Sequence, residues 1–219
     1  MAGTGSNCTA TAIEATQKAE KIGVDASLQV VPYYNRPCQE GIYEHFKAIA
    51  SHTFLPIMLY NIPGRTGRNL EPETVARLAQ IPNIVGIKEA AGSVDQVKKI
   101  KALVPPEFKI YSGDDALTLS FMESGACGVV SVASHCAGTQ IYEMVQAFTE
   151  GDKTKAYMID QVLKPLFDVL FITTNPAPVK AALDMMGFKM GGLRLPLVSV
   201  NEAQRTEIQM VLQQLGIIS

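Results

Sequence analysis

The chain has 219 residues, 47% of them apolar and 18% charged, which is the composition of a globular protein with enough material for one sizeable core. A net charge of −2 without a basic stripe, together with the absence of tryptophan, argues against a nucleic-acid-binding surface. No apolar run approaches the roughly 18 residues of a membrane span, and no segment resembles a signal peptide. The four cysteines form no C-x-x-C pair and no histidine stands at metal-ligand spacing, so we expect reduced thiols, a cytoplasmic location and no metal.

Helix-forming and strand-forming segments alternate along the first 134 residues. We expect helices at 9–22, 39–51, 72–80, 93–103 and 115–124. We expect strands at 26–31, 56–61, 83–90, 109–113 and 128–132. From about residue 138 the chain is expected to be helical, with breaks at Asn175-Pro-Ala-Pro178 and in a glycine-rich loop at 187–192.

Strands separated by helices of this length predict an α/β fold with a parallel sheet. The even spacing of five strands favours a (β/α) barrel of the TIM type over a doubly wound sheet, and no G-x-G-x-x-G fingerprint is present. We therefore predict a partial barrel in residues 1–137. Residues 138–219 are expected to supply the last barrel helix and a helical C-terminal extension.

The most informative segment is the strand at 83–90, in which five apolar or glycine residues run into Lys88. Strict alternation places Ile84, Gly86 and Lys88 on one face and Val85 and Glu89 on the other, and we expect Gly86 to leave space for the lysine. If that face lines a barrel interior, the ammonium loses hydration, its pKa falls, and the free amine can form a Schiff base with a carbonyl. The alternative is a lysine at a strand end that reaches into water.

Tyrosines stand at two other strand ends, where barrel enzymes carry their chemistry. Tyr33 and Tyr34 follow the strand at 26–31, and Tyr60 lies at the end of the strand at 56–61. A lysine nucleophile beside phenols that can carry protons favours catalysis over a surface lysine.

Five motifs then follow one another along the chain. They are Pro32-Tyr-Tyr-Asn-Arg-Pro37, Leu59-Tyr-Asn-Ile-Pro-Gly-Arg-Thr66, Gly86-Ile-Lys-Glu-Ala90, Tyr111-Ser-Gly-Asp-Asp115 and Asn175-Pro-Ala-Pro-Val-Lys180. Their order and spacing resemble the dihydrodipicolinate synthase (4-hydroxy-tetrahydrodipicolinate synthase) family, which are class I aldolase-like barrels, over essentially the whole chain. The resemblance implies condensation of pyruvate with aspartate semialdehyde in lysine and diaminopimelate biosynthesis, with no metal or organic cofactor.

The resemblance also implies roles for individual residues. Lys88 would form the Schiff base with pyruvate, Tyr60 would move protons to and from it, and Tyr34 would extend this relay across a subunit contact. Arg65 would hold the carboxylate of aspartate semialdehyde, a contact that suits a guanidinium. Gly113 and Val130 correspond to positions that shape the pyruvate pocket, although a pure core role for Val130 is equally open.

A second set of residues matches the surroundings of the family's allosteric lysine site. Asn7 and Tyr33 stand at such positions. Thr11 replaces the acidic residue that the family pattern would have four positions after Asn7, which argues against feedback by lysine.

The chain departs from the family pattern in its length and in one motif. A typical barrel of this type takes about 250 residues. Here about five strands are identifiable, Ala2-Gly-Thr-Gly5 resembles the tail of the family's third strand, and no Thr-Thr-Gly-Glu motif is present. We therefore expect a barrel that is incomplete at the N-terminus. Its open sheet edges favour association, so we expect a homo-oligomer.

Two other functions remain open at this point. One is a catalytically inactive truncated barrel that acts as an assembly partner. The other is a different pyruvate-dependent aldolase, such as an enzyme of the sialic-acid lyase type, although that branch lacks the Gly-Arg-Thr around Arg65. Small-molecule substrates are expected in each enzymatic case, with neither nucleic acid nor a membrane as partner.

Overall fold

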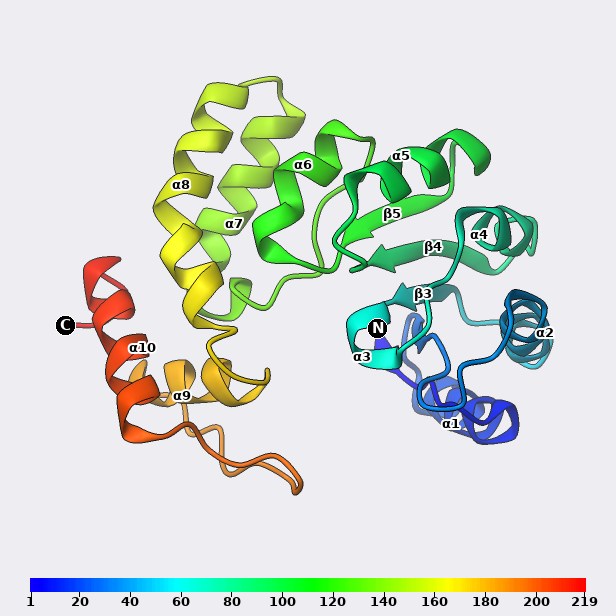
Figure 1. Cartoon of the computed structure of the whole chain (residues 1–219), viewed down its shortest axis with the longest axis horizontal. Helices are drawn as coiled ribbons and strands as arrows, with labels where there is room; N and C mark the ends of the chain where they lie inside the picture. The colour runs from blue at the N-terminus through cyan, green and yellow to red at the C-terminus, as the bar shows by residue number, and fades with distance from the viewer. The chain divides into compact units, whose positions relative to one another are not determined.

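The computed structural model describes all residues, Met1–Ser219, and they form two compact units, Met1–Val130 and Ser131–Ser219 (Figure 1). The first unit contains a five-stranded parallel sheet with the strands in sequence order. Its strands are β1 (Ala2–Gly3), β2 (Ser27–Val30), β3 (Ile57–Asn61), β4 (Ile84–Glu89) and β5 (Lys109–Ser112). Since β1 and β5 do not pair with each other, this sheet is open.

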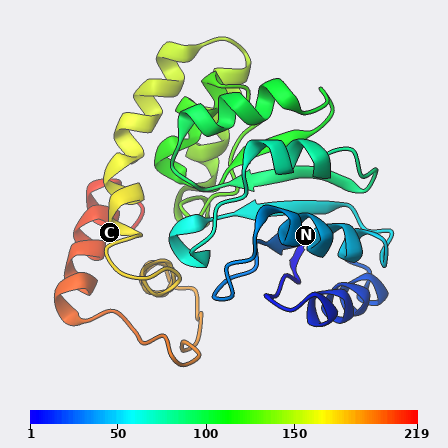
Figure 2. The ribbon, with the colours of Figure 1, turned by 45° about the vertical axis from the view of Figure 1, so that its right-hand side comes forward.

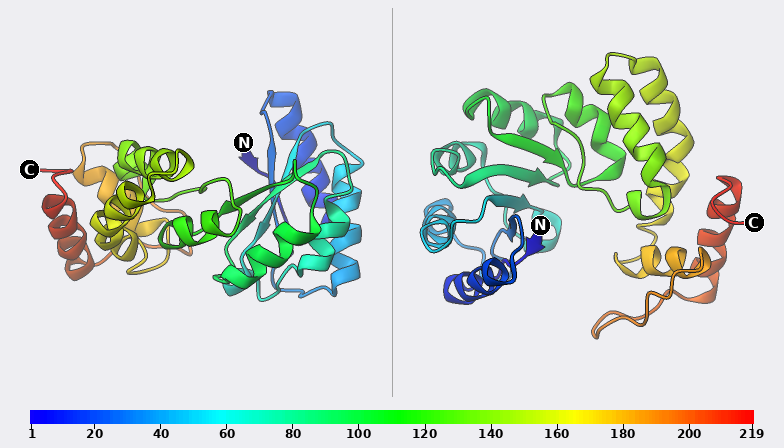
Figure 3. Two further views of the ribbon diagram at one scale, coloured as in Figure 1. Left: turned by 90° about the horizontal axis from the view of Figure 1, so that it is seen from above. Right: turned by 180° about the vertical axis from the view of Figure 1, so that it is seen from behind.

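The helices of the first unit connect successive strands. They are α1 (Thr9–Ile22), α2 (Gln39–Ala50), α3 (Pro63–Thr66), α4 (Pro72–Leu78), α5 (Val94–Leu103) and α6 (Thr118–Glu123), with a short 3₁₀ turn η1 (Asp115–Leu117) before α6. Seen from above, α1, α2, α4 and α5 lie along the same face of the sheet (Figure 3), and Figure 2 shows this helical layer from another side. The alternating pattern of strand and helix is confirmed.

Only the helix-covered face of the sheet is fully buried. Gln29, Leu59, Ile87 and Ile110 are register partners on four adjacent strands, and all are 0% exposed. Leu59, Ile87 and Ile110 pack with apolar side chains of the helices, among them Phe46, into one core. The side chains of the opposite face are only partly buried.

The prediction of a strand at 128–132 is wrong. The segment forms a single parallel bridge, in which Val129 pairs with Ser112. Gly128 has a φ of 151°, outside the range that a regular strand of L-residues uses. Before it, the N–H of Cys127 donates to the carbonyl of Ile110, but no regular ladder forms around the bridge. The fifth strand is instead β1, at Ala2–Gly3, within the segment that resembled a strand tail.

The prediction that side chains alternate strictly between the two faces of β4 is also wrong at the start of the strand. Ile57 pairs with Ile84 and Met58 pairs with Gly86, so Val85 is an extra residue in the strand. This bulge moves Ile84 into the core, at 3% exposed, and leaves Val85 37% exposed. From Gly86 onward the alternation holds, and Lys88 and Glu89 lie on opposite faces as predicted.

The second unit is helical, as expected for the end of the chain. It contains α7 (Ser134–Thr149), α8 (Lys153–Val169), α9 (Ala177–Met185) and α10 (Glu202–Gln214). Asp152 caps α8, and Asn201 forms a capping box with Gln204 at the start of α10. No helix of the chain combines the length and apolarity that crossing a membrane requires. The predicted boundary at 137/138 concerns membership of a barrel and stays a prediction.

Candidate active site

A row of four side chains crosses the open face of the sheet near the C-terminal ends of the strands. Val30 pairs with Tyr60, Tyr60 with Lys88, and Lys88 with Tyr111. Register partners on parallel strands point to the same side, and all four side chains are half-buried. Sheet register alone therefore brings the predicted nucleophile Lys88 and the predicted proton carrier Tyr60 together.

The amine of Lys88 lies against the ring of Tyr60. The Nζ atom is 4.3 Å from the ring centroid. Burial lowers the pKa of Lys88, the negative charge of Asp115 opposes that shift, and the positive charge of Arg65 adds to it. The fall in pKa expected for this lysine is thus confirmed in direction, and it increases the fraction of nucleophilic free amine near neutral pH.

The phenol of Tyr60 is shifted in the other direction. Burial raises the pKa of Tyr60, although Arg65 partly counteracts this. The hydroxyl therefore stays protonated over a wide pH range and can donate a proton. A phenol whose pKa is raised, next to an amine whose pKa is lowered, is a suitable pair for forming and breaking a carbon–nitrogen bond.

Space for the lysine is provided by Gly113, and the role predicted for Gly86 is wrong. A Cβ atom on Gly113 would lie 2.7 Å from the Cβ of Ala90 and 3.1 Å and 3.2 Å from Cε and Cγ of Lys88. A Cβ atom on Gly86 would instead collide with the carbonyl oxygen of Lys109. Gly86 therefore permits the close approach of β4 and β5.

Arg65 lies on the short helix α3, directly after β3. Its side chain is exposed, and its charge acts on both Lys88 and Tyr60. Helix α3 ends at Gly67, whose φ of 74° favours glycine, and the buried hydroxyl of Thr66 donates to the carbonyls of Ile62 and Arg68. The turn that follows Arg65 is thus stabilised by local hydrogen bonds of the Thr66 side chain.

Tyr34 does not join this group within the chain. Its side chain is 89% exposed, and its φ of 72° is unusual for an aromatic residue. The neighbouring Asn35 donates through its side chain to the carbonyl of Asn7 at 2.9 Å. That bond brings the loops of Asn7 and Tyr33 side by side, and the side chain of Tyr33 is 42% exposed.

Val130 lies where the single bridge ends. Its N–H donates to the carbonyl of Ser112 at 2.8 Å, and its side chain is partly buried. The backbone there is held against the end of β5, so both roles open for Val130 are compatible with its position.

Two acidic residues near Lys88 were not identified from the sequence. Asp115 is 2% exposed and its charge acts on Lys88, whereas Asp114 caps η1 by accepting from the N–H of Ala116. Glu89 is 0% exposed and follows Lys88 directly. The sequence did contain a signal for Glu89, because a carboxylate at the end of an apolar strand is unusual. Glu89 is also the register partner of Asn61 on the adjacent strand β3.

No group of three or more His, Cys, Asp or Glu side chains is placed to hold a metal ion.

Comparison with known proteins agrees with this geometry. The model of the Dihydrodipicolinate synthetase family matches residues 1–215. The 4-hydroxy-tetrahydrodipicolinate synthase of Thermosynechococcus vestitus is 57% identical over 219 residues, covering 100% of this chain and 74% of that protein. The synthase of the same name from Acaryochloris marina is 62% identical over 198 residues, covering 90% of this chain and 67% of that protein.

A solved structure shows the same backbone. The lysine-bound crystal structure of DHDPS from Cyanidioschyzon merolae superimposes with a TM-score of 0.97 at 46% identity, covering 99% of this chain and 74% of that chain. The family model spans nearly all residues, and the relatives far exceed the identity at which a shared fold and ancestry are in doubt. The chain therefore belongs to the dihydrodipicolinate synthetase family.

Proposed function

We propose that this chain is a lyase of the 4-hydroxy-tetrahydrodipicolinate synthase type, which condenses pyruvate with aspartate semialdehyde in lysine and diaminopimelate biosynthesis. The observation that carries the proposal is the position of Lys88 Nζ, 4.3 Å from the ring centroid of Tyr60, with burial lowering the pKa of the amine. The names of the matched relatives support the same reaction. The proposed chemistry uses a covalent Schiff base and no metal or organic cofactor.

The proposed sequence begins with attack of the free amine of Lys88 on the keto carbon of pyruvate. The resulting carbinolamine loses its hydroxyl as water, with Tyr60 as the source of the proton, and leaves an imine. The phenolate of Tyr60 then takes up a proton from the methyl carbon, which gives an enamine. The enamine attacks the aldehyde carbon of the second substrate, and Tyr60 returns its proton to the aldehyde oxygen. Arg65 would bind the carboxylate of that substrate, while Gly113 and Val130 would shape the pyruvate pocket through their backbone.

The remaining site residues belong to the proposal as well. We assign Tyr34 to the active site of a second copy of the chain, as the family resemblance implies, and its side chain, 89% exposed, is accessible to such a copy. Asn7 and Tyr33 are proposed for a lysine site, and the lysine bound by the related DHDPS supports this. Because residue 11 is threonine where the family pattern is acidic, feedback by lysine is expected to be weak.

The fold is proposed to be part of a TIM-type barrel. An open parallel sheet whose helices cover one face is the arrangement of a barrel segment, with Lys88 on the inward face. In this reading residues 1–137 belong to the barrel, and residues 138–219 supply its last helix and the C-terminal extension. The helical second unit supports that division.

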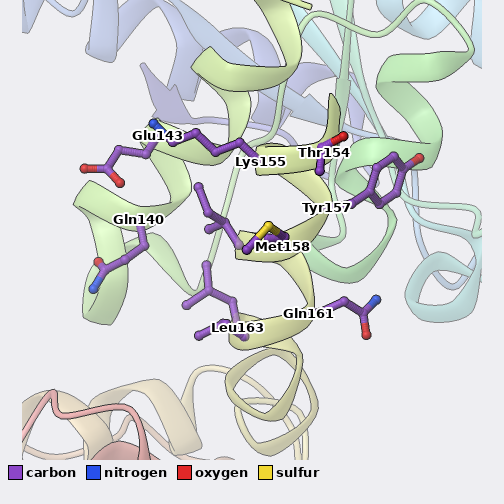
Figure 4. A pocket seen from close by; sticks show the side chains of 10 residues that line it. Gln140, Glu143, Thr154, Lys155, Tyr157, Met158, Gln161 and Leu163 are labelled. Atoms are coloured by element: carbon purple, nitrogen blue, oxygen red, sulfur yellow. The ribbon is translucent and has the colours of Figure 1, made fainter. Parts of the chain in front are cut away.

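Homo-oligomerisation is proposed from two exposed features. One is Tyr34. The other is a groove of about 710 Å³ along α7 and α8, to which α7 contributes Gln140 and Glu143 (Figure 4). Met158 and Val162 of α8 line it and are 67% and 61% exposed. A sedimentation experiment that finds only monomer would contradict the proposed homo-oligomer.

A cytoplasmic location is proposed as well, since all four cysteines are free thiols.

The test of the function is reduction with borohydride in the presence of pyruvate, followed by peptide mass spectrometry. We expect an adduct on Lys88, and a product assay with aspartate semialdehyde should then show turnover. An inactive assembly partner would give no adduct. An enzyme of the sialic-acid lyase type would give the adduct but would not use aspartate semialdehyde. The matched relatives are named synthases, so neither alternative is favoured.

A further inference from the structure

A buried carboxylate lies directly behind the proposed nucleophile. Glu89 is the last residue of β4, and its side chain points to the helix-covered face, opposite to Lys88. It is 0% exposed, and burial raises the pKa of its carboxyl group while the surrounding hydrogen bonds oppose that shift. An acidic side chain at such a position is rare without partners that compensate for the lost hydration.

All hydrogen-bond partners of this carboxylate are neutral donors. Asn61 Nδ2 lies 3.1 Å and 3.0 Å from its two oxygens, Gln96 Nε2 donates at 3.0 Å, and the N–H of Ala91 donates at 2.7 Å. A group surrounded only by donors must act as an acceptor on both oxygens, which suits a carboxylate and not an amide.

The cluster continues to the loop that carries Arg65. Asn61 Nδ2 also donates to Asn69 Oδ1 at 2.8 Å, and Asn61 Oδ1 accepts from the N–H of Leu70 at 3.0 Å. Asn69 and Gln96 exchange two further bonds, of 2.9 Å and 3.2 Å. We call Glu89, Asn61, Asn69 and Gln96 the Glu89 cluster.

Two members of the proposed active site are chain neighbours of this cluster. Tyr60 precedes Asn61, Lys88 precedes Glu89, and the two pairs are register partners on β3 and β4. The loop with Arg65 leaves the sheet at Asn61 and returns to it at Asn69 and Leu70. Both ends of that loop are therefore fastened to one side-chain cluster.

We infer that Glu89 is a positioning residue: through Asn61, Gln96 and Asn69 its carboxylate holds together the strand ends and the loop that set Lys88, Tyr60 and Arg65 relative to one another. This inference deepens the proposed function and rests on it. Reactions that depend on aligned groups are sensitive to displacements of about 1 Å, which can cost as much as a hundredfold in rate. The buried carboxylate of Glu89 lies on the sheet face opposite to Lys88, so it would act only through Lys88, Tyr60 and Arg65.

The principal test uses Glu89→Gln, which keeps the shape and places an NH₂ group against donors. We expect the rate of pyruvate adduct formation on Lys88 to fall at least about tenfold. We also expect the pH midpoint for acetylation of Lys88 by acetic anhydride, followed by mass spectrometry, to rise as the strand end loosens and water enters. The KM for aspartate semialdehyde should rise too, because the loop of Arg65 is no longer held.

The double variant Glu89→Gln, Gln96→Glu exchanges donor and acceptor between the two side chains. It should recover part of the adduct rate. Gln29→Ala is the matched control, because Gln29 is equally buried on the same sheet face and donates to Thr4, Thr16 and Ser27. It should lower the melting temperature and leave the adduct rate and the Lys88 midpoint unchanged.

The outcomes separate the two proposals. If Glu89→Gln behaves like Gln29→Ala in all three measurements, the positioning role is overturned and the proposed function stands. If the unaltered protein forms no adduct with pyruvate, the proposed function is overturned, and the Lys88 acetylation midpoint alone then decides whether Glu89 positions the lysine. Should Glu89→Gln fail to fold, Asn69→Ala is expected to raise the KM for aspartate semialdehyde, and an unchanged KM would refute the inference.

Discussion

Replacing Gly113 by alanine tests how closely Lys88 is packed. The new Cβ would lie 2.7 Å from the Cβ of Ala90, whereas carbon atoms in contact normally stay about 3.5–4.0 Å apart. The Cβ of Ala90 is fixed to the backbone and cannot rotate away. The other two contacts, at 3.1 Å and 3.2 Å, involve carbons of Lys88 that can move. We therefore expect Lys88 to be displaced and the backbone between Gly113 and Ala90 to spread.

The loss of stability in Gly113→Ala should come from this overlap alone. Gly113 does not have a positive φ, so its backbone conformation is allowed for alanine. Overpacking of this kind costs about 1–3 kcal/mol. In a chain of this size each kcal/mol lowers the melting temperature by roughly 2–4 °C. A shift of Lys88 by about 1 Å would slow adduct formation with pyruvate by up to about a hundredfold.

Thermal unfolding and borohydride trapping measure the two effects. Gly3→Ala is the control, because a Cβ on Gly3 meets nothing within 4 Å and this glycine belongs to the same sheet. A Gly113→Ala protein with the melting temperature and trapping rate of the control would refute the packing described for Lys88.

Three further predictions follow from the site and from the core. Lys88→Arg should keep the fold and form no pyruvate adduct, since a guanidinium stays protonated; trapping with mass spectrometry checks this, and an adduct elsewhere in the chain would show that another amine is the nucleophile. Arg65→Ala should raise the KM for aspartate semialdehyde more than that for pyruvate, and equal changes in steady-state kinetics would argue against carboxylate binding by Arg65. Burial lowers the pKa of His45 to about 4 from an ordinary value of 6.5, so as the pH falls His45 is protonated in the unfolded chain at a higher pH than in the folded chain. The contribution of neutral His45 to the free energy of unfolding is therefore complete above about pH 6.5 and is lost as the pH falls toward 4, by about 3 kcal/mol in total. Urea unfolding between pH 7 and 4 measures this loss, which should shrink in His45→Asn.

The alternation of strands and helices was predictable because it depends on local pattern. The apolar runs ending at Tyr60 and Lys88 are short and bounded by turn residues, and such runs form strands with little help from distant parts of the chain. The cap at Asp114 is equally local, because it needs only the N–H of Ala116. The segment at 128–132 was predicted wrongly because its apolar residues suit a strand, while the φ of Gly128 does not.

Sequence alone determined which residues are chemically able to form an imine, since an amine at a strand end and phenols at neighbouring ends are visible in the order of the letters. The tertiary structure decided what surrounds that amine. The bulge at Val85, the room left by Gly113 and the donors around Glu89 all depend on contacts between segments far apart in the chain. Packing and hydrogen bonding across strands act over a few ångströms in space, and residue spacing along one strand carries no record of them.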